Sequence, residues 1–207
     1  MFPIGDENRT RKFFPLITIV LLLANIVVFF FEVTRGQAFI ERWAFVPANF
    51  AADPLGNWES LFTSLFLHGG LLHLASNMIY LLIFGDNIEH RFGYLPFILF
   101  YFLSGAFGNL AHLAFSSGSS TPVIGASGAI AGVLGAYILL YPKRPVRVLM
   151  FITIIRLPAV VVIGAWFILQ LMSSLAIFSG TAETGGIAYL AHVGGFVTGF
   201  LMTFIFR

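Results

Sequence analysis

Four polar residues in apolar stretches of the sequence are of the types that perform acyl transfer. Ser127 lies in a Gly-Ala-Ser-Gly run, and His192 follows Ala191 in another apolar stretch. His73 and Asn77 are spaced i, i+4 in a third stretch, so they share one face of a helix. A serine hydroxyl becomes a strong nucleophile only when an adjacent base accepts its proton, and histidine is the most frequent base. The pattern therefore indicates Ser127 as nucleophile and His192 as its base.

Each of these residues also has a plainer interpretation. Serine and asparagine often form hydrogen bonds between membrane helices, so Ser127 or Asn77 alone indicates packing. A histidine inside a span is rarer and favours a function. The joint placement of these residues near the start of three separate stretches favours one shared polar site. His112, in a further stretch, is expected at the outer end of its span in an interfacial role.

The composition predicts an all-α membrane protein. Hydrophobic residues make up 58% of the 207 residues and charged residues 10%, whereas about a quarter of an ordinary soluble domain is charged. So few charges do not cover the surface of a soluble protein this size, and lipid must surround most of the chain. The net charge is only +2, and the basic residues lie in short clusters. We interpret these clusters as signals of membrane topology and not as a nucleic-acid surface. Because the sequence has no cysteine, it offers no thiolate nucleophile and no cysteine metal site.

The elements that must position the polar residues are six predicted transmembrane helices in a single domain, residues 1–207. The apolar stretches lie at 13–31, 71–84, 94–115, 126–141, 157–178 and 186–206. Residues 1–12 are expected to form a cytoplasmic N-terminal segment. Residues 32–70 combine aromatic residues and prolines with few charges, which is typical of a loop that lies in the membrane interface.

The basic residues predict the orientation of the bundle. If the N-terminus is cytoplasmic, only Arg35 and Arg42 of the 11 lysines and arginines fall on the outer side, as the positive-inside rule favours. The second, fourth and sixth spans then enter the membrane from the outer face. We therefore expect His73, Ser127 and His192 at similar depth.

Glycines indicate that the fourth and sixth spans pack closely. Gly128 and Gly132 are spaced i, i+4 beside the serine, and Gly195 and Gly199 follow His192 at i+3 and i+7. Small residues at such spacing let two helix backbones approach each other. A serine and an imidazole on these helices can then reach the ~3 Å that proton transfer needs.

No carboxylate is placed to complete a catalytic triad. None of the nine aspartates and glutamates falls in the outer half of a span near His192. In a triad, an aspartate orients the imidazole and supports its charge. The expected unit is therefore a dyad, in which helix packing orients His192.

With these motifs in order, the chain resembles the rhomboid family of intramembrane serine proteases over nearly its whole length. The matching residues are His68, His73, Asn77, Glu89, Arg91, Gly93, the run 125–128, Ala191, His192, Gly195 and Gly199. The resemblance implies a six-helix core that cleaves the transmembrane segments of single-span membrane proteins in the lipid bilayer. We expect no metal, cofactor or nucleic acid to take part.

The resemblance also implies roles for individual residues and a cellular location. Ser127 and His192 would form the dyad, and His73, Asn77 and the backbone N–H of Ser127 would bind the oxyanion. His68 would have a structural role near the first loop. We expect a multi-pass protein of the bacterial inner membrane with a cytoplasmic N-terminus.

Two positions depart from the family pattern. The frequent Trp-Arg pair of the first loop is replaced by Trp58 and Glu59, so a role for that arginine does not carry over. Some members have an aromatic residue one turn after the nucleophile, which stacks on the histidine. Ala131 occupies that position here, so His192 must be held by other contacts.

Other classes of protein fit the sequence less well. An α/β-hydrolase needs Gly-x-Ser-x-Gly between a strand and a helix, and a zinc protease needs His-Glu-x-x-His. Neither motif is present, and only Asp86 lies near a span, where an aspartyl protease needs two buried carboxylates. A transporter would carry charges at span centres. The main alternative is a rhomboid-like protein that binds membrane helices for quality control without cutting them, although such proteins lose the serine or the histidine.

Overall fold

The computed structural model describes residues 2–7, 14–178 and 188–206. The basic residues at 9–12, on which the expected orientation partly rests, lie outside the described residues. The expected starts of the first and last spans, at residues 13 and 186, lie outside them as well.

The described chain is a bundle of apolar helices. Five segments are long and apolar enough to cross a membrane: Leu16–Arg35, Leu71–Phe92, Tyr94–Ser116, Ala159–Ala176 and Tyr189–Phe206. They correspond to α1 (Leu16–Arg35), α5 (Leu71–Tyr80) with η2 (Leu81–Gly85) and α6 (Asp86–Phe92), α7 (Tyr94–Ser116), α9 (Ala159–Phe178) and α10 (Tyr189–Phe206). The protein is therefore an integral, multi-pass membrane protein.

The fourth expected span is a shorter helix, so the count of six full spans is not confirmed. This helix, α8 (Ser127–Leu140), has 14 residues, or about 21 Å at 1.5 Å per residue. Residues 128–137 of α8 are all buried. Because other helices surround α8, its length need not match the thickness of the lipid.

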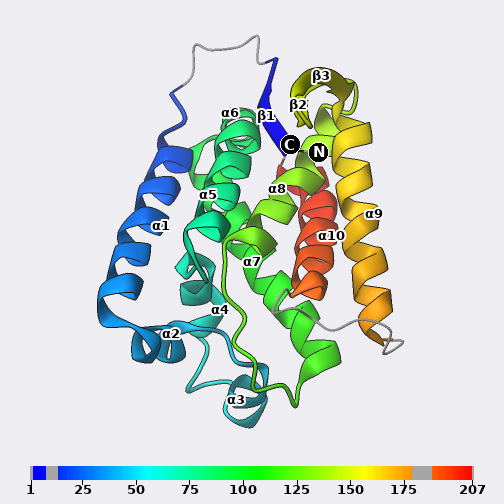
Figure 1. Cartoon of the computed structure of the whole chain (residues 1–207). Helices are drawn as coiled ribbons and strands as arrows, with labels where there is room; N and C mark the ends of the chain where they lie inside the picture. Colours follow the sequence, from blue (N-terminus) through cyan, green and yellow to red (C-terminus); the bar gives the residue numbers. More distant parts are fainter. Residues whose placement is uncertain (1, 8–13, 179–187, 207) are drawn as a thin grey trace.

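Two long helices, α1 and α9, lie at the edges of the bundle. α1 and α9 lie at opposite sides, with α8 and α10 between them (Figure 1). α10 packs most extensively against α8 and α7, while α9 packs mainly on α10 and α8. α8 and α10 therefore form the rigid centre of the fold, and α9 is a peripheral helix.

Glycines make the close contact between α8 and α10. A methyl group on Gly195 would overlap the carbonyl oxygen of Gly128, and one on Gly199 would overlap the backbone of Gly132. A methyl group on Gly108 of α7 would lie 2.6 Å from the carbonyl oxygen of Ala191. Only hydrogen fits at these positions, so the glycines set the distance between the helices.

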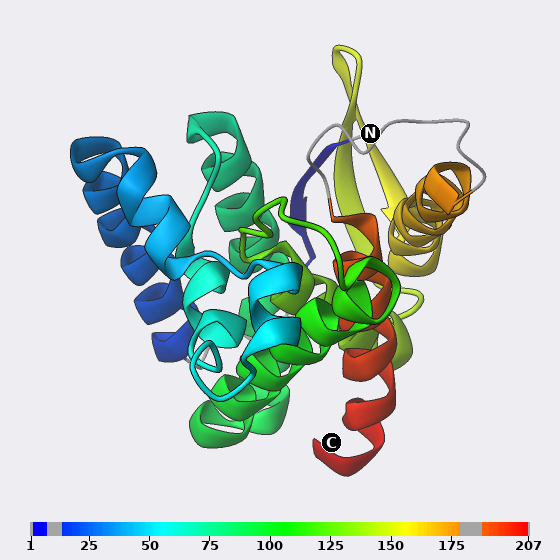
Figure 2. The same cartoon turned by 90° about the horizontal axis from the view of Figure 1, so that it is seen from below.

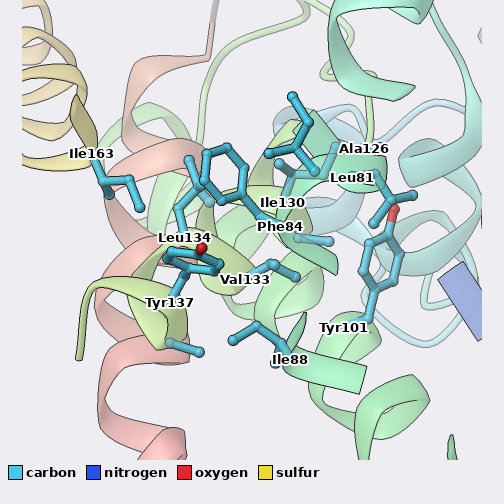
Figure 3. Packing of buried hydrophobic residues seen from close by; sticks show 14 of the residues in the cluster. Leu81, Phe84, Ile88, Tyr101, Ala126, Ile130, Val133, Leu134, Tyr137 and Ile163 are labelled. Carbon is cyan, nitrogen blue, oxygen red and sulfur yellow. The ribbon is translucent and has the colours of Figure 1, made fainter. Parts of the chain in front are cut away.

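The apolar core gathers around α8. Ile130, Val133 and Tyr137 of α8 face Phe84 and Ile88 of the α5–α6 segment (Figure 3). The rings of Phe84 and Tyr137 meet edge to face, with centroids 4.9 Å apart. This packing fixes the second and fourth expected spans relative to each other.

Two buried carboxylates fasten α1 to the bundle. Glu89 of α6 accepts hydrogen bonds at 2.8 Å from the backbone N–H groups of Ile17 and Thr18, and at 2.6 Å from the Thr18 hydroxyl. The first N–H groups of a helix lack partners inside the helix, and Glu89 supplies them from another helix. At the other end of α1, Glu32 accepts the backbone N–H of His68 at 2.8 Å.

The first loop folds into short helices at one end of the bundle. They are α2 (Gln37–Trp43), α3 (Pro47–Ala52), α4 (Ser60–Thr63) and η1 (Ser64–Phe66). Aromatic pairs join α4 and η1 to α7: Phe62 with Phe102 at a centroid distance of 6.1 Å, and Phe66 with Phe102 at 6.0 Å. The location of residues 32–70 in the membrane interface stays a prediction.

A small antiparallel sheet lies at the opposite end, where the sequence led us to expect helices and loops only. Its strands are β1 (Phe2–Asp6), β2 (Pro145–Met150) and β3 (Thr153–Pro158), in the order β1-β2-β3. Figure 2 shows the β2–β3 hairpin extending away from the helices. The alternation of buried Val146 and Val148 with exposed Arg147 and Leu149 is the period-two pattern of a strand.

Two local features explain where the sheet begins and ends. Leu157, the expected first residue of the fifth span, lies in β3, so that boundary is wrong and α9 begins at Ala159. A residue before proline avoids the helical region, and Leu157 precedes Pro158. β1 is held by Asp6, which accepts hydrogen bonds from Tyr137 Oη at 2.6 Å and Asn87 Nδ2 at 3.0 Å.

Candidate active site

Ser127 is the first residue of α8, and the turn before it depends on glycine. Gly125 has φ +120°, a conformation that other residues rarely adopt. A methyl group there would also lie 2.9 Å from the ring of His73. The N–H of Gly125 donates to the carbonyl oxygen of Ser64 at 2.9 Å. This turn presents the serine at the N-terminus of a buried helix.

His192 lies in the first turn of α10 and contacts the serine directly. Its Nε2 is 2.6 Å from Ser127 Oγ, although 65 positions separate the two residues. The glycine contact between α8 and α10 brings them together, because Gly195 lies one turn after His192 against the turn that begins α8. A hydrogen bond of this length is what proton transfer from a hydroxyl to an imidazole requires.

The other imidazole nitrogen contacts a residue that was not expected from the sequence. His192 Nδ1 lies 2.7 Å from Oε1 of Gln170 in α9. The Trp166 ring, one turn earlier in α9, has its centroid 6.0 Å from the imidazole. A carboxylate is the usual partner of this nitrogen, yet an amide inside an apolar stretch is itself a signal of a buried polar contact. Contacts from α9 thus replace the aromatic ring absent at Ala131.

His73 and Asn77 lie on α5, in the wall of the same cavity. The cavity has a volume of about 840 Å³, and its lining includes His73, Asn77, Ser127, Gln170 and His192. Asn77 is buried, and its Nδ2 has no hydrogen-bond partner among the residues that the structure describes. A buried, unpaired amide donor costs free energy unless a ligand pairs with it. Asn77 is therefore suited to donate a hydrogen bond to a bound group.

Three helix N-termini converge on this cavity. His73 is the third residue of α5, Ser127 the first of α8 and His192 the fourth of α10. The unpaired N–H groups at a helix N-terminus carry a partial positive charge. The electrostatic potential of the backbone at the site therefore favours a negative charge on a bound atom.

His68 lies beside the cavity, before α5 begins. Its side chain is buried, its Nδ1 is 3.2 Å from the Phe66 carbonyl oxygen, and its ring centroid is 5.0 Å from that of His73. Burial and, to a smaller extent, the neighbouring His73 together lower the pKa of His68 to about 4, against the opposing effect of the Phe66 hydrogen bond. His68 is therefore neutral at pH 7 and packs against His73.

The remaining expected residues do not line the cavity. His112, in the last turns of α7, is not among the residues that line the cavity. Glu59 pairs with Arg42 at 3.2 Å on the surface of the first loop. Among the described residues, no cluster of three or more histidines, aspartates and glutamates is placed to hold a metal ion.

The fold and this site define a helical membrane protein with a serine–histidine pair at the N-termini of two tightly packed helices. The model of the Rhomboid domain matches residues 55–207. The chain therefore belongs to the rhomboid family. The matched range includes His68, His73, Asn77, Ser127 and His192.

Relatives from bacteria and plants share this similarity. The rhomboid protease GluP of Bacillus subtilis is 34% identical over 188 residues, which cover 90% of this chain and 34% of GluP. The putative rhomboid protease YdcA of the same organism is 26% identical over 94% of this chain and 89% of its own length. RHOMBOID-like protein 6, mitochondrial, of Arabidopsis thaliana is 30% identical over 70% of this chain and 42% of that protein. The chain thus spans less than half the length of two of these three relatives, GluP and RHOMBOID-like protein 6.

Proposed function

We propose that this protein is an intramembrane serine endopeptidase that cleaves transmembrane segments of other membrane proteins. The observation that carries the proposal is the 2.6 Å contact between Ser127 Oγ and His192 Nε2. Membership of the rhomboid family, which includes proteins named as proteases, supports it. Ser127 is the nucleophile and His192 is the general base.

The reaction is acyl transfer in two steps. His192 Nε2 takes the hydroxyl proton while Ser127 Oγ attacks the scissile carbonyl carbon. The protonated imidazole then gives its proton to the leaving amine, and the C–N bond breaks. Water then attacks the resulting ester on Ser127, with His192 again as base. The bond between the acyl carbon and Oγ breaks, His192 returns the proton to Oγ, and the new carboxyl end departs.

The negative charge on the carbonyl oxygen is met by three donors. They are the side chains of His73 and Asn77 and the backbone N–H of Ser127. The unpaired Nδ2 of Asn77 supports this role, because such a donor is ready for charge that develops in the transition state. The N-termini of α5, α8 and α10 add a favourable potential.

The substrates are single-span membrane proteins whose helices unwind locally at the cut. The carbonyl groups of an intact helix are hydrogen-bonded and shielded by side chains, so Ser127 Oγ reaches a peptide carbonyl only where the helix opens. Small or helix-weakening residues at the cleavage site are therefore favoured. The site opens toward the outer face of a bacterial inner membrane, with the N-terminus and the sheet on the cytoplasmic side.

The test is cleavage by purified protein in liposomes. The parent, Ser127→Ala and His192→Ala are each incubated with a panel of single-span proteins, and new termini are mapped by mass spectrometry. We expect cleavage by the parent and none by either variant. Substantial cleavage by a folded Ser127→Ala or His192→Ala protein would remove that residue from the mechanism. Binding of substrates by the parent without cleavage would support the non-proteolytic alternative.

A further inference from the structure

The contact between Gln170 and His192 carries an inference that rests on the function proposed above. We propose that Gln170 is the positioning residue of the dyad, in the place where a triad has its carboxylate. Its side-chain carbonyl oxygen accepts a hydrogen bond from His192 Nδ1–H across 2.7 Å. The bond holds the imidazole at the angle and in the tautomer that the reaction needs.

The tautomer follows from the inventory of donors and acceptors. A neutral imidazole carries one proton, and the nitrogen without the proton is the acceptor. An amide oxygen accepts only, so Nδ1 must hold the proton and Nε2 is left free to accept. Nε2 is the nitrogen that lies 2.6 Å from Ser127 Oγ. The opposite tautomer would place N–H against the serine oxygen, and His192 would no longer act as a base.

The orientation of the ring depends on the same helix. Trp166 lies one turn before Gln170 in α9 and packs beside the imidazole. Tyr189 approaches the imidazole edge-on from α10, with centroids 6.4 Å apart. On α8 the position one turn after the serine is Ala131, which has no aromatic ring to stack on the imidazole. Gln170 therefore supplies a polar contact to His192, and Trp166 and Tyr189 supply aromatic contacts.

An amide suits this location better than a carboxylate. Gln170 is half-buried in the cavity wall, where a carboxylate would lose part of its hydration, and the described part of α9 around Gln170 offers no cation to pair with it. The amide fixes the tautomer without a charge, and in return it stabilises the imidazolium less than a carboxylate would. A Gln170→Glu substitution should therefore change the pH dependence of the reaction, which a role in packing alone would not do.

The experiment compares Gln170→Met, Gln170→Glu and the control Ser174→Ala in liposomes. Methionine keeps a similar length and loses the acceptor, whereas glutamate keeps an acceptor oxygen. Ser174 is a buried polar residue one turn further along α9, bonded to the Gln170 carbonyl oxygen at 2.9 Å and outside the cavity. For each protein we measure kcat and KM between pH 5 and 9, the melting temperature, and the rate at which a fluorophosphonate labels Ser127.

We expect Gln170→Met to lower kcat and the labelling rate at least ~10-fold, as loss of a well-placed general base would, with little change in KM or melting temperature. Gln170→Glu should recover much of the activity. Its acid limb should move to higher pH, by roughly one unit or more, because a carboxylate stabilises the protonated imidazole. Among the described residues, the other titratable groups around His192 are His73, His112 and Tyr189, and these variants leave them unchanged. Ser174→Ala should behave like the parent.

Two results would overturn the positioning role and leave the proposed function intact. One is a Gln170→Met protein with the parent's kcat and labelling rate. The other is a Gln170→Glu protein that is as impaired as Gln170→Met and has an unshifted pH profile. Failure of the protease proposal looks different, because Ser127→Ala would then retain cleavage in the same assay.

Discussion

Gly195 of α10 lies so close to the carbonyl oxygen of Gly128 in α8 that a methyl group on Gly195 would overlap this oxygen. The contact lies one turn from His192 and at the turn that begins with Ser127. The distance between Ser127 and His192 is therefore set by the absence of a side chain at a third position, Gly195.

Replacing Gly195 by alanine should move Ser127 and His192 apart. Overpacking of this kind costs about 1–3 kcal/mol, and a misplacement of ~1 Å can lower the rate about 100-fold. We expect Gly195→Ala to lose at least ~10-fold in kcat/KM and to melt at a lower temperature. The control is Gly164→Ala in α9, where a methyl group would meet no described atom within 4 Å. Parent-like activity in Gly195→Ala would show that the helices can separate without moving the dyad.

Asn77→Ala separates oxyanion binding from packing. An oxyanion donor acts on charge that exists only in the transition state, and loss of one donor costs about 100- to 1,000-fold in acyl-transfer enzymes. Because His73 and the backbone N–H of Ser127 would share the charge in the proposed oxyanion site, we expect kcat to fall by at least ~10-fold with a melting temperature near that of the parent. A clear fall in melting temperature with normal turnover by the folded fraction would make Asn77 a structural residue.

Glu89→Gln should destabilise the fold without touching the site. The carboxylate accepts three hydrogen bonds from Ile17 and Thr18, and an amide would turn a donor toward some of these donors. A buried polar group left unpaired costs about 1–3 kcal/mol. We expect a lower melting temperature and an unchanged kcat for the folded protein. Glu41→Gln, at an exposed position of α2, is the matched control and should melt like the parent.

The stability of the protein should fall on acidification through His68. Its pKa is about 4 in the folded protein, below the ordinary value of 6.5, so the unfolded chain binds a proton more readily. The stabilisation is complete above pH 6.5 and is lost as the pH falls toward 4. We therefore expect the melting temperature of the parent to drop more steeply between pH 7 and 5 than that of His68→Asn. Equal slopes for the two proteins would remove His68 as a cause.

Cysteine labelling tests the orientation, because the sequence contains no cysteine of its own. Ser120 is exposed before α8 and Ile152 is 96% exposed at the tip of the β2–β3 hairpin. In intact cells a membrane-impermeant maleimide should label Ser120→Cys and not Ile152→Cys. After permeabilisation both should react. The reverse pattern would place the hairpin and the N-terminus outside.

Much of the fold, and the residues of the candidate site, could be predicted from local patterns in the sequence. Apolar stretches as long as a bilayer is thick force helices, since backbone polar groups in lipid must pair within their own segment. The same requirement makes polar residues in those stretches conspicuous, and for this reason Ser127, His192, His73 and Asn77 stand out in the sequence alone. The glycines of α8 and α10 can also be recognised in the sequence, because their spacing matches the period of an α-helix.

Other features depended on contacts between distant segments. Gln170 reaches His192 only because of how α9 is shifted and rotated against α10. The spacing of residues within α9 does not determine that shift or rotation. The pairing of β1 with β2 joins residues more than a hundred positions apart, and α8 is short because its neighbours bury it and it need not span the lipid. Periodicity and hydropathy indicate whether a segment must be surrounded by lipid, by protein or by water. Which segment meets that requirement is decided by the packing of the whole bundle.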